Sequence, residues 1–171
     1  MKNQDTTTPT ADFGFTKVAQ EDKAPLVADV FRSVAHRYDL MNDLMSMGGH
    51  RLWKDFLIRR SAVRPGQWVL DVAAGTGDLV RRFAAQVGEQ GRVVAIDINS
   101  QMLNLGRSRL VDAGVAGNVD YLIGDAENLP LRTRQFDCVS IAFGLRNVTR
   151  ISSALESMAS MLRPGGRLLV L

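Results

Sequence analysis

Cysteine, histidine and aromatic residues are scarce in this sequence of 171 residues. It contains one cysteine and two histidines, and aromatic residues make up 6%. A single cysteine excludes a disulfide framework within the chain, and Cys138, inside the apolar run 136–143, is predicted to be a core residue rather than a nucleophile. Because no Cys or His pair has ligand spacing, the sequence predicts no metal site.

Long apolar runs and a strong excess of one charge are also absent. No apolar stretch approaches the roughly 20 residues of a membrane span, and the N-terminus lacks the charged and then apolar pattern of a signal peptide. We therefore expect a cytoplasmic protein. The formal net charge is +3, with Lys and Arg scattered among acids, so no nucleic-acid partner is predicted.

Three segments differ in their patterns. Residues 1–24 are polar with few apolar anchors, and we expect a mobile N-terminal arm there. Residues 25–64 carry apolar side chains at helical spacing and predict a helical extension. In residues 65–171, apolar strands alternate with amphipathic helices, which is typical of a doubly wound, Rossmann-like α/β domain. The predicted strands are 68–73, 92–98, 119–123, 136–143 and 167–171, and the predicted helices are 50–61, 77–87, one capped by Ser100, and 151–162.

The stretch from Trp68 to Leu79 predicts a buried strand, a tight turn at Gly75 and Gly77, and the start of a helix. The glycines let backbone N–H groups approach a nucleotide closely. A dinucleotide fingerprint would have a third glycine, but Val80 stands in that position.

Two carboxylates flank the same turn. Asp71 would end the strand and Asp78 would begin the helix, and each like-charge contact with a pyrophosphate at about 4 Å would cost about 1 to 4 kcal/mol. The pair favours a cation, and the nucleotide cofactor that is cationic there is S-adenosylmethionine. The alternative is that Asp78 is only a helix cap and Asp71 a solvated strand end.

Acidic residues end or follow three successive predicted strands, at Asp71, Asp97 and Asp125. Since the carboxyl ends of parallel strands share one edge of a sheet, we expect these side chains to lie around one site. Asp97 could accept hydrogen bonds from both ribose hydroxyls, and Asp125 from the adenine amino group.

A basic, partly apolar helix is predicted just before the first strand. It could lie on an anionic membrane surface, although a solvated helix face is an equally open interpretation. Its residues are Arg51, Lys54, Arg59 and Arg60 around Leu52, Trp53, Phe56 and Leu57.

Several motifs together resemble one family. They are Tyr38-Asp39-x-Met41-Asn42 with Ser46, His50 and Trp53, then Phe143-Gly144-Leu145-Arg146-Asn147-Val148, and Pro164-Gly165-Gly166-Arg167-Leu168. They resemble the UbiE/COQ5 quinone-biosynthesis methyltransferases, which are class I S-adenosylmethionine-dependent enzymes. The resemblance implies C-methylation of a lipid quinol, either demethylmenaquinol or 2-methoxy-6-polyprenyl-1,4-benzoquinol.

The resemblance also implies roles for individual residues. Thr76, Asp97, Asp125 and Ala126 fall on the family's cofactor contacts, beside Asp71, Gly75 and Gly77. From the chemistry of the methyl transfer, rather than from the resemblance, we expect Arg146 to favour an ionised phenol and Asn147 to orient the ring, with an ion pair to a nearby acid as the alternative role of Arg146. Tyr38, Asn42 and His50 would line the substrate entrance, with core packing as an equally open alternative.

The sequence departs from the family in length. A class I sheet has seven strands, whereas five are predicted here, so we expect a truncated form that lacks the final strand pair. Three alternatives stay open for function: a non-catalytic cofactor-binding module, a small-molecule methyltransferase outside quinone synthesis, which the family motifs oppose, and an NAD-linked oxidoreductase, which Val80 disfavours. An unpaired fifth strand could pair with a second copy. The Met-rich segment before the basic helix, together with that helix, suggests a route for the lipid tail and peripheral contact with the inner face of the cytoplasmic membrane.

Overall fold

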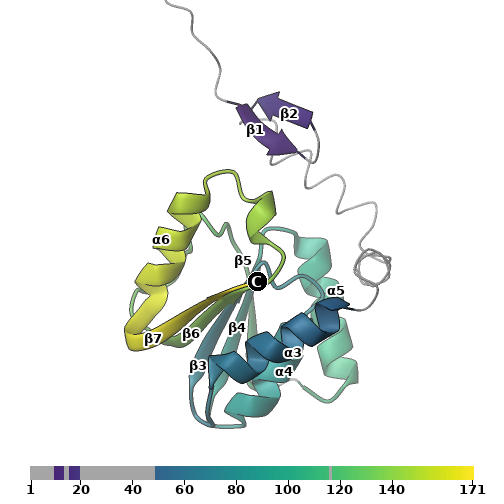
Figure 1. Ribbon diagram of the computed structural model, residues 1–171. Coiled ribbons are helices and arrows are strands. Elements are labelled where there is room, and N and C mark those ends of the chain that lie inside the picture. Colours follow the sequence, from purple (N-terminus) through teal and green to yellow (C-terminus); the bar gives the residue numbers. More distant parts are fainter. Residues whose placement is uncertain (1–9, 14–15, 20–48, 116) are drawn as a thin grey trace, which may run out of the picture.

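A computed structural model describes residues 10–13, 16–19, 49–115 and 117–171 (Figure 1). Near the N-terminus, β1 (Thr10–Phe13) and β2 (Thr16–Ala19) form an antiparallel hairpin, where the sequence suggested no regular structure. The helix expected from residue 25, together with Tyr38 and Asn42, lies outside the described residues.

The main sheet has five parallel strands. They are β3 (Trp68–Val72), β4 (Arg92–Asp97), β5 (Val119–Ile123), β6 (Phe136–Ile141) and β7 (Leu162–Val170). Their order is β5-β4-β3-β6-β7. The chain therefore runs from β3 outward through β4 to β5, returns to β6 on the other side of β3, and continues outward to β7. This confirms the predicted doubly wound sheet, in which a ligand binds at the reversal point.

Helices cover both faces of the sheet (Figure 1). On one face, α3 (Gly49–Ser61), α4 (Asp78–Val87) and α5 (Ser100–Asp112) bury their apolar sides against residues such as Val69. On the other face, α6 (Ile151–Met161) packs against residues such as Leu70. Successive strand residues point to opposite faces, so the nearly continuous apolar runs of β3 and β6 fill both cores. Cys138 lies in the first of these cores, as predicted.

Two local predictions were wrong. The N-cap of α5 is Asn99 rather than Ser100, because the Asn99 side chain accepts hydrogen bonds from the backbone N–H groups of Gln101 and Met102. The last strand begins at Leu162 rather than Arg167. Its pairing with β6 shifts from Phe136↔Leu162 to Cys138↔Arg167. The Pro-Gly-Gly segment therefore forms an irregularity within β7 instead of separating the helix from the strand.

In the described part of the chain, no helix is both long and apolar enough to cross a membrane.

Candidate cofactor site

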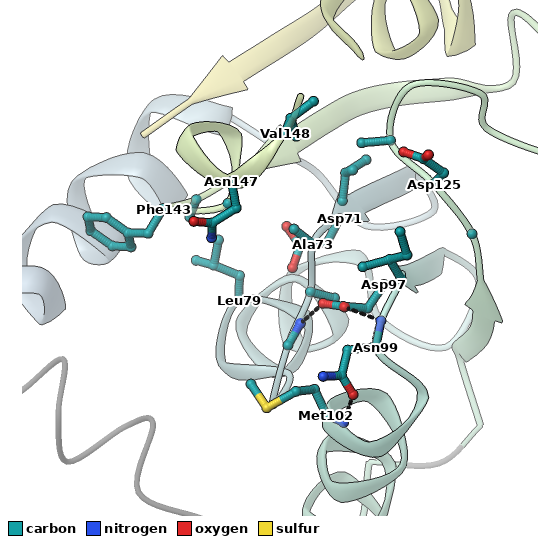
Figure 2. A pocket seen from close by; sticks show the side chains of 18 of the residues that line it. Asp71, Ala73, Leu79, Asp97, Asn99, Met102, Asp125, Phe143, Asn147 and Val148 are labelled. Atoms are coloured by element: carbon teal, nitrogen blue, oxygen red, sulfur yellow. Dashed lines mark hydrogen bonds between the residues drawn. The ribbon is translucent and has the colours of Figure 1, made fainter. Parts of the chain in front are cut away.

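A cavity lies at the carboxyl ends of the central strands, where the strand order reverses. The turns that follow β3, β4, β5 and β6 line it, and α3 contributes the side chain of Lys54. Figure 2 shows Asp71, Asp97 and Asp125 around this cavity, with Asn147 approaching from the segment after β6. The strand-end acids are thus brought together as the sequence predicted.

Asp71 is buried within β3. It is 2% exposed, and the Ser140 hydroxyl of neighbouring β6 donates a hydrogen bond of 2.6 Å to its Oδ1. Burial raises the pKa of Asp71 to about 7, even though the Ser140 hydrogen bond and the charge of Lys54 act in the opposite direction. The alternative of a solvated strand end is therefore wrong. A cationic ligand in the cavity would favour the ionised form of this carboxyl group.

Asp97 ends β4 and connects two turns. Its Oδ2 accepts a hydrogen bond of 2.7 Å from the N–H of Gly75, and its Oδ1 accepts one of 2.8 Å from the N–H of Asn99 (Figure 2). Burial raises the pKa of Asp97, although these backbone donors partly offset the effect. A carboxylate offers about four lone-pair sites, so both oxygens can still accept hydrogen bonds from a ligand.

The glycine turn needs its glycines. Gly75 has φ of 55° and Gly77 of 81°, a left-handed conformation that disfavours other residues. The turn also rests on α5, because a Cβ on Gly106 would lie 2.9 Å from the carbonyl carbon of Thr76. Gly75 and Thr76 line the cavity, whereas Gly77 does not line it and lies against Leu110 of α5.

The turn after β5, which carries Asp125, is held in place by Glu127. Asp125 and Ala126 line the cavity, and the Asp125 Oδ1 accepts a hydrogen bond of 2.9 Å from the N–H of Glu127. The Glu127 carboxylate in turn accepts hydrogen bonds from the N–H groups of Thr149 (3.1 Å) and Arg150 (2.8 Å), and from Arg150 Nε (2.6 Å). Glu127 therefore ties the turn after β5 to the segment that leads into α6.

Asp78 begins α4 without capping it. The N-cap is Gly77, which makes no side-chain cap hydrogen bond. Instead, the Asp78 carboxylate lies 2.9 Å from Lys54 Nζ and 3.2 Å from Arg82 Nε, and Arg82 also pairs with Asp55. Burial raises the pKa of Asp78, but Lys54 and Arg82 outweigh it and the pKa is lowered. This network joins α3 to the helix that follows the glycine turn.

Two residues beside the cavity have strained backbone conformations. Ala73, after β3, has φ of 53°, and Phe143, after β6, has φ of 58°. Both line the cavity. Left-handed conformations of residues other than glycine are costly and concentrate at ligand sites, which agrees with the position of this cavity.

The predicted pair Arg146 and Asn147 separates in the structure. Both belong to the short helix η2 (Leu145–Asn147). Asn147 lines the cavity, whereas Arg146 is exposed and is not among the lining residues. His50 is in α3, but its side chain, like Tyr38 and Asn42, lies outside the described structure. The roles of these residues remain predictions.

Sequence reasoning missed Lys54 and Asn99 as site residues. The sequence pattern assigns Lys54 to the basic surface of its helix, and no local spacing relates it to Asp78, which lies 24 positions further along the chain. Asn99 could have been found, since an Asn shortly after a strand-end acid and before an apolar helix is a common N-cap signal. Within the described residues, no group of three or more His, Cys, Asp or Glu side chains is arranged to hold a metal ion.

Known proteins with similar sequences agree on one family. The model of the ubiE/COQ5 methyltransferase family matches residues 16–171. The ubiquinone/menaquinone biosynthesis C-methyltransferase UbiE of Ectopseudomonas mendocina (strain ymp) is 60% identical over 163 residues, 95% of this chain and 64% of that protein. The protein of the same name from Serratia proteamaculans (strain 568) is 59% identical over 162 residues, with the same coverage. The chain thus spans 64% of the length of these curated relatives.

Among solved structures, a SAM-dependent methyltransferase from Aquifex aeolicus superposes with a TM-score of 0.63 and 26% identity. The superposition covers 68% of this chain and 62% of that protein. It confirms the predicted Rossmann-like class I methyltransferase fold. From the match over residues 16–171 and these relatives, the chain belongs to the ubiE/COQ5 methyltransferase family.

Proposed function

We propose that this chain forms the cofactor-binding part of an enzyme that uses S-adenosylmethionine to methylate a ring carbon of a polyprenylated quinol, in menaquinone biosynthesis, ubiquinone biosynthesis or both. Membership of the ubiE/COQ5 family and the names of the relatives support this reaction. The structural observation that carries the proposal is the convergence of Asp71, Asp97 and Asp125 on one cavity beside the glycine turn.

The cavity suits a cationic nucleotide better than an anionic one. Five carboxyl groups line it, those of Asp71, Asp78, Asp97, Asp125 and Glu127, against one ammonium group. A pyrophosphate would be repelled by this surface, whereas an ammonium and a sulfonium would be attracted to it. The free lone pairs of Asp97 suit the ribose hydroxyls, and the carboxylate of Asp125, which lines the cavity beside Ala126, can accept a hydrogen bond from the adenine amino group.

S-adenosylmethionine would supply an electrophilic methyl group, which leaves the chain's own residues with alignment and charge as their tasks. Asn147 lines the cavity, and its side-chain amide can orient the quinol ring through hydrogen bonds. A neutral phenol is a weak carbon nucleophile, and its ionisation raises the electron density of the adjacent ring carbon.

Arg146, beside Asn147 on η2, is the candidate for stabilising that phenolate. Its guanidinium stays protonated, so it would act as a fixed charge or order a water molecule rather than serve as the base.

The same proposal includes peripheral contact with the inner face of the cytoplasmic membrane. Three large apolar side chains of α3 are exposed, Leu52 (70%), Trp53 (58%) and Phe56 (53%). Arg59 and Arg60 are exposed in the last turn, and the Arg60 guanidinium lies 5.8 Å from the centre of the Phe56 ring. Apolar side chains flanked by cations are the pattern that favours an anionic lipid surface, where a polyprenyl tail would reside.

The direct test is transfer of a labelled methyl group from S-adenosylmethionine to a short-chain demethylmenaquinol. We expect a form of the protein extended to the full length of its relatives to produce the C-methylated quinol. We would assay the present chain in parallel, because it spans 64% of those relatives. Cofactor binding by the extended form without any methylated product would contradict the proposed reaction.

A further inference from the structure

The cavity has an unequal distribution of charge. Of the residues that line it, five are acidic, and Lys54 is the one that carries a positive charge. Lys54 comes from α3, which precedes the sheet, whereas the acids belong to the sheet, its turns and the start of α4. Its side chain is 15% exposed and lines the cavity, so it is largely withdrawn from solvent at the site.

The surroundings of Lys54 leave it able to bind a second anion. Its Nζ lies 2.9 Å from Asp78 Oδ2, and an ammonium has three donor hydrogens. Asp78 does not depend on Lys54 alone, because Arg82 also contacts its carboxylate at 3.2 Å. The charge of Lys54 also acts on the buried Asp71, where it lowers the pKa against the opposing effect of burial.

The proposed cofactor makes a specific demand on such a site. Its amino-acid end carries both an ammonium and a carboxylate. Asp71 and its acidic neighbours can attract the ammonium, but they would repel the carboxylate unless a cation is near it. Among the residues lining the cavity, Lys54 is the side chain with the required charge.

We propose that Lys54 binds the carboxylate of the cofactor's amino-acid end and so selects S-adenosylmethionine over analogues that lack this group. The proposal rests on the cofactor assignment made above. Asp78 then positions the Lys54 ammonium at the cavity wall, and Arg82 holds Asp78 through its second carboxylate oxygen. This arrangement makes α3 part of the cofactor site rather than only a surface helix.

A purely structural role for Lys54 is the competing explanation. The Lys54–Asp78 ion pair joins α3 to α4, and the buried Leu57 of α3 contributes to the same core as Leu79 of α4. In that case the loss of Lys54 would disturb the binding of every ligand to a similar extent. The proposed role instead predicts a loss confined to ligands that carry the carboxylate.

Isothermal titration calorimetry separates carboxylate binding by Lys54 from a structural role. The two ligands are S-adenosylmethionine and decarboxylated S-adenosylmethionine, which differ only in the carboxylate. We expect the unsubstituted chain to bind S-adenosylmethionine about tenfold to a hundredfold more tightly, as for one charge-assisted contact. In Lys54→Met this preference should fall below about threefold, mainly through weaker binding of S-adenosylmethionine. Lys54→Arg should keep most of the preference because it keeps the charge.

Arg81→Met is the matched control, since Arg81 is an exposed cation on α4 that does not line the cavity, and it should leave the preference unchanged. Equal weakening of both ligands in Lys54→Met would overturn the proposal in favour of the structural role. Equal affinity of the unsubstituted chain for both ligands would overturn it without any variant. No binding of either ligand to the unsubstituted chain would instead overturn the cofactor assignment on which the proposal rests.

Discussion

Ser140 and Asp71 face each other on adjacent central strands, and the Ser140 hydroxyl donates a hydrogen bond of 2.6 Å to the Asp71 carboxyl group. Both side chains are buried. The pair places a titratable acid, with its pKa raised by burial to about 7, on the wall of the cavity. Its charge state should therefore influence what the cavity binds at physiological pH.

Cofactor affinity should rise with pH as Asp71 loses its proton. An ionised Asp71 attracts the cofactor's cationic end, whereas the protonated form does not. We expect the Kd for S-adenosylmethionine to decrease between pH 5.5 and 7.5, a range in which the cofactor's own ammonium stays largely protonated. Asp71→Asn should bind more weakly and with a flatter pH profile. Calorimetric titration across this pH range measures the Kd of the original chain and of Asp71→Asn. The same dependence of Kd on pH in the two proteins would contradict the role of Asp71.

Stability without ligand should respond to pH in the opposite direction. Because the pKa of Asp71 is higher in the folded chain than the ordinary value of 3.8, the folded state holds this proton more tightly. Its contribution to stability is fully present below about pH 4 and is lost as the pH rises through about 7. Comparing urea unfolding of the original chain and Asp71→Asn between pH 4 and 8 isolates this contribution. If the difference in unfolding free energy between the original chain and Asp71→Asn does not change with pH, this contribution of Asp71 is refuted.

The Glu127 carboxylate should be worth more to stability than an exposed ion pair. Burial alone would raise the pKa of Glu127, but hydrogen bonds from the Arg150 N–H and side chain outweigh it and lower the pKa. Glu127→Ala leaves several donors unpaired and should cost about 1 to 3 kcal/mol of unfolding free energy, with weaker cofactor binding as the turn carrying Asp125 loosens.

The matched control for Glu127 is Asp120→Ala. Asp120 pairs with Arg92 at 2.7 Å, but the two side chains are 52% and 42% exposed, so its loss should cost less than about 1 kcal/mol. Denaturant unfolding of the two variants provides the comparison. Similar losses in both would mean that Glu127 does not connect the two segments as described.

Arg146 should matter for turnover rather than for cofactor affinity. It is exposed on η2 and does not line the cavity, so Arg146→Ala should leave the Kd for S-adenosylmethionine within about twofold. If its charge favours the phenolate, kcat of a form extended to the relatives' length should fall about tenfold or more. Unchanged kcat would remove Arg146 from the proposed mechanism.

Contact with anionic membranes should depend on the exposed apolar side chains of α3. Sedimentation with anionic vesicles at low salt should recover the chain, and raising the salt concentration should release it. The double substitution Trp53→Ser and Phe56→Ser should abolish vesicle binding. Val111→Ser is the control and should not, because Val111 is also apolar and exposed but belongs to α5 rather than to α3. Absence of binding at low salt would argue against the membrane contact.

The fold could be predicted because its local signals agree with the tertiary structure. The apolar run after Trp68, the glycines of the turn and the acids at the strand ends together defined the sheet and its binding edge. Asp71 was placed correctly along the chain, but the hydrogen bond that its buried carboxyl group accepts comes from Ser140 on a neighbouring strand, 69 positions away. That relationship is set by the sheet register and has no local sequence signal.

Other site features also depend on packing between distant segments. Lys54 reaches Asp78 because α3 packs against α4, so helical periodicity could assign it only to a charged surface. Arg146 and Asn147 are neighbours in sequence, yet only Asn147 lines the cavity, because a short helical turn directs adjacent side chains differently. The start of β7 was missed because Pro164 and the two glycines after it usually interrupt regular structure, and here they lie within an irregular strand.

The central claim is that this sheet edge binds S-adenosylmethionine, and the most direct test is calorimetric titration of the 171-residue chain with S-adenosylhomocysteine, with NADH as the control. The acidic lining predicts saturable binding of S-adenosylhomocysteine at one site and none of NADH. Binding of NADH alone, or no binding of S-adenosylhomocysteine to a chain that circular dichroism shows to be folded, would contradict it.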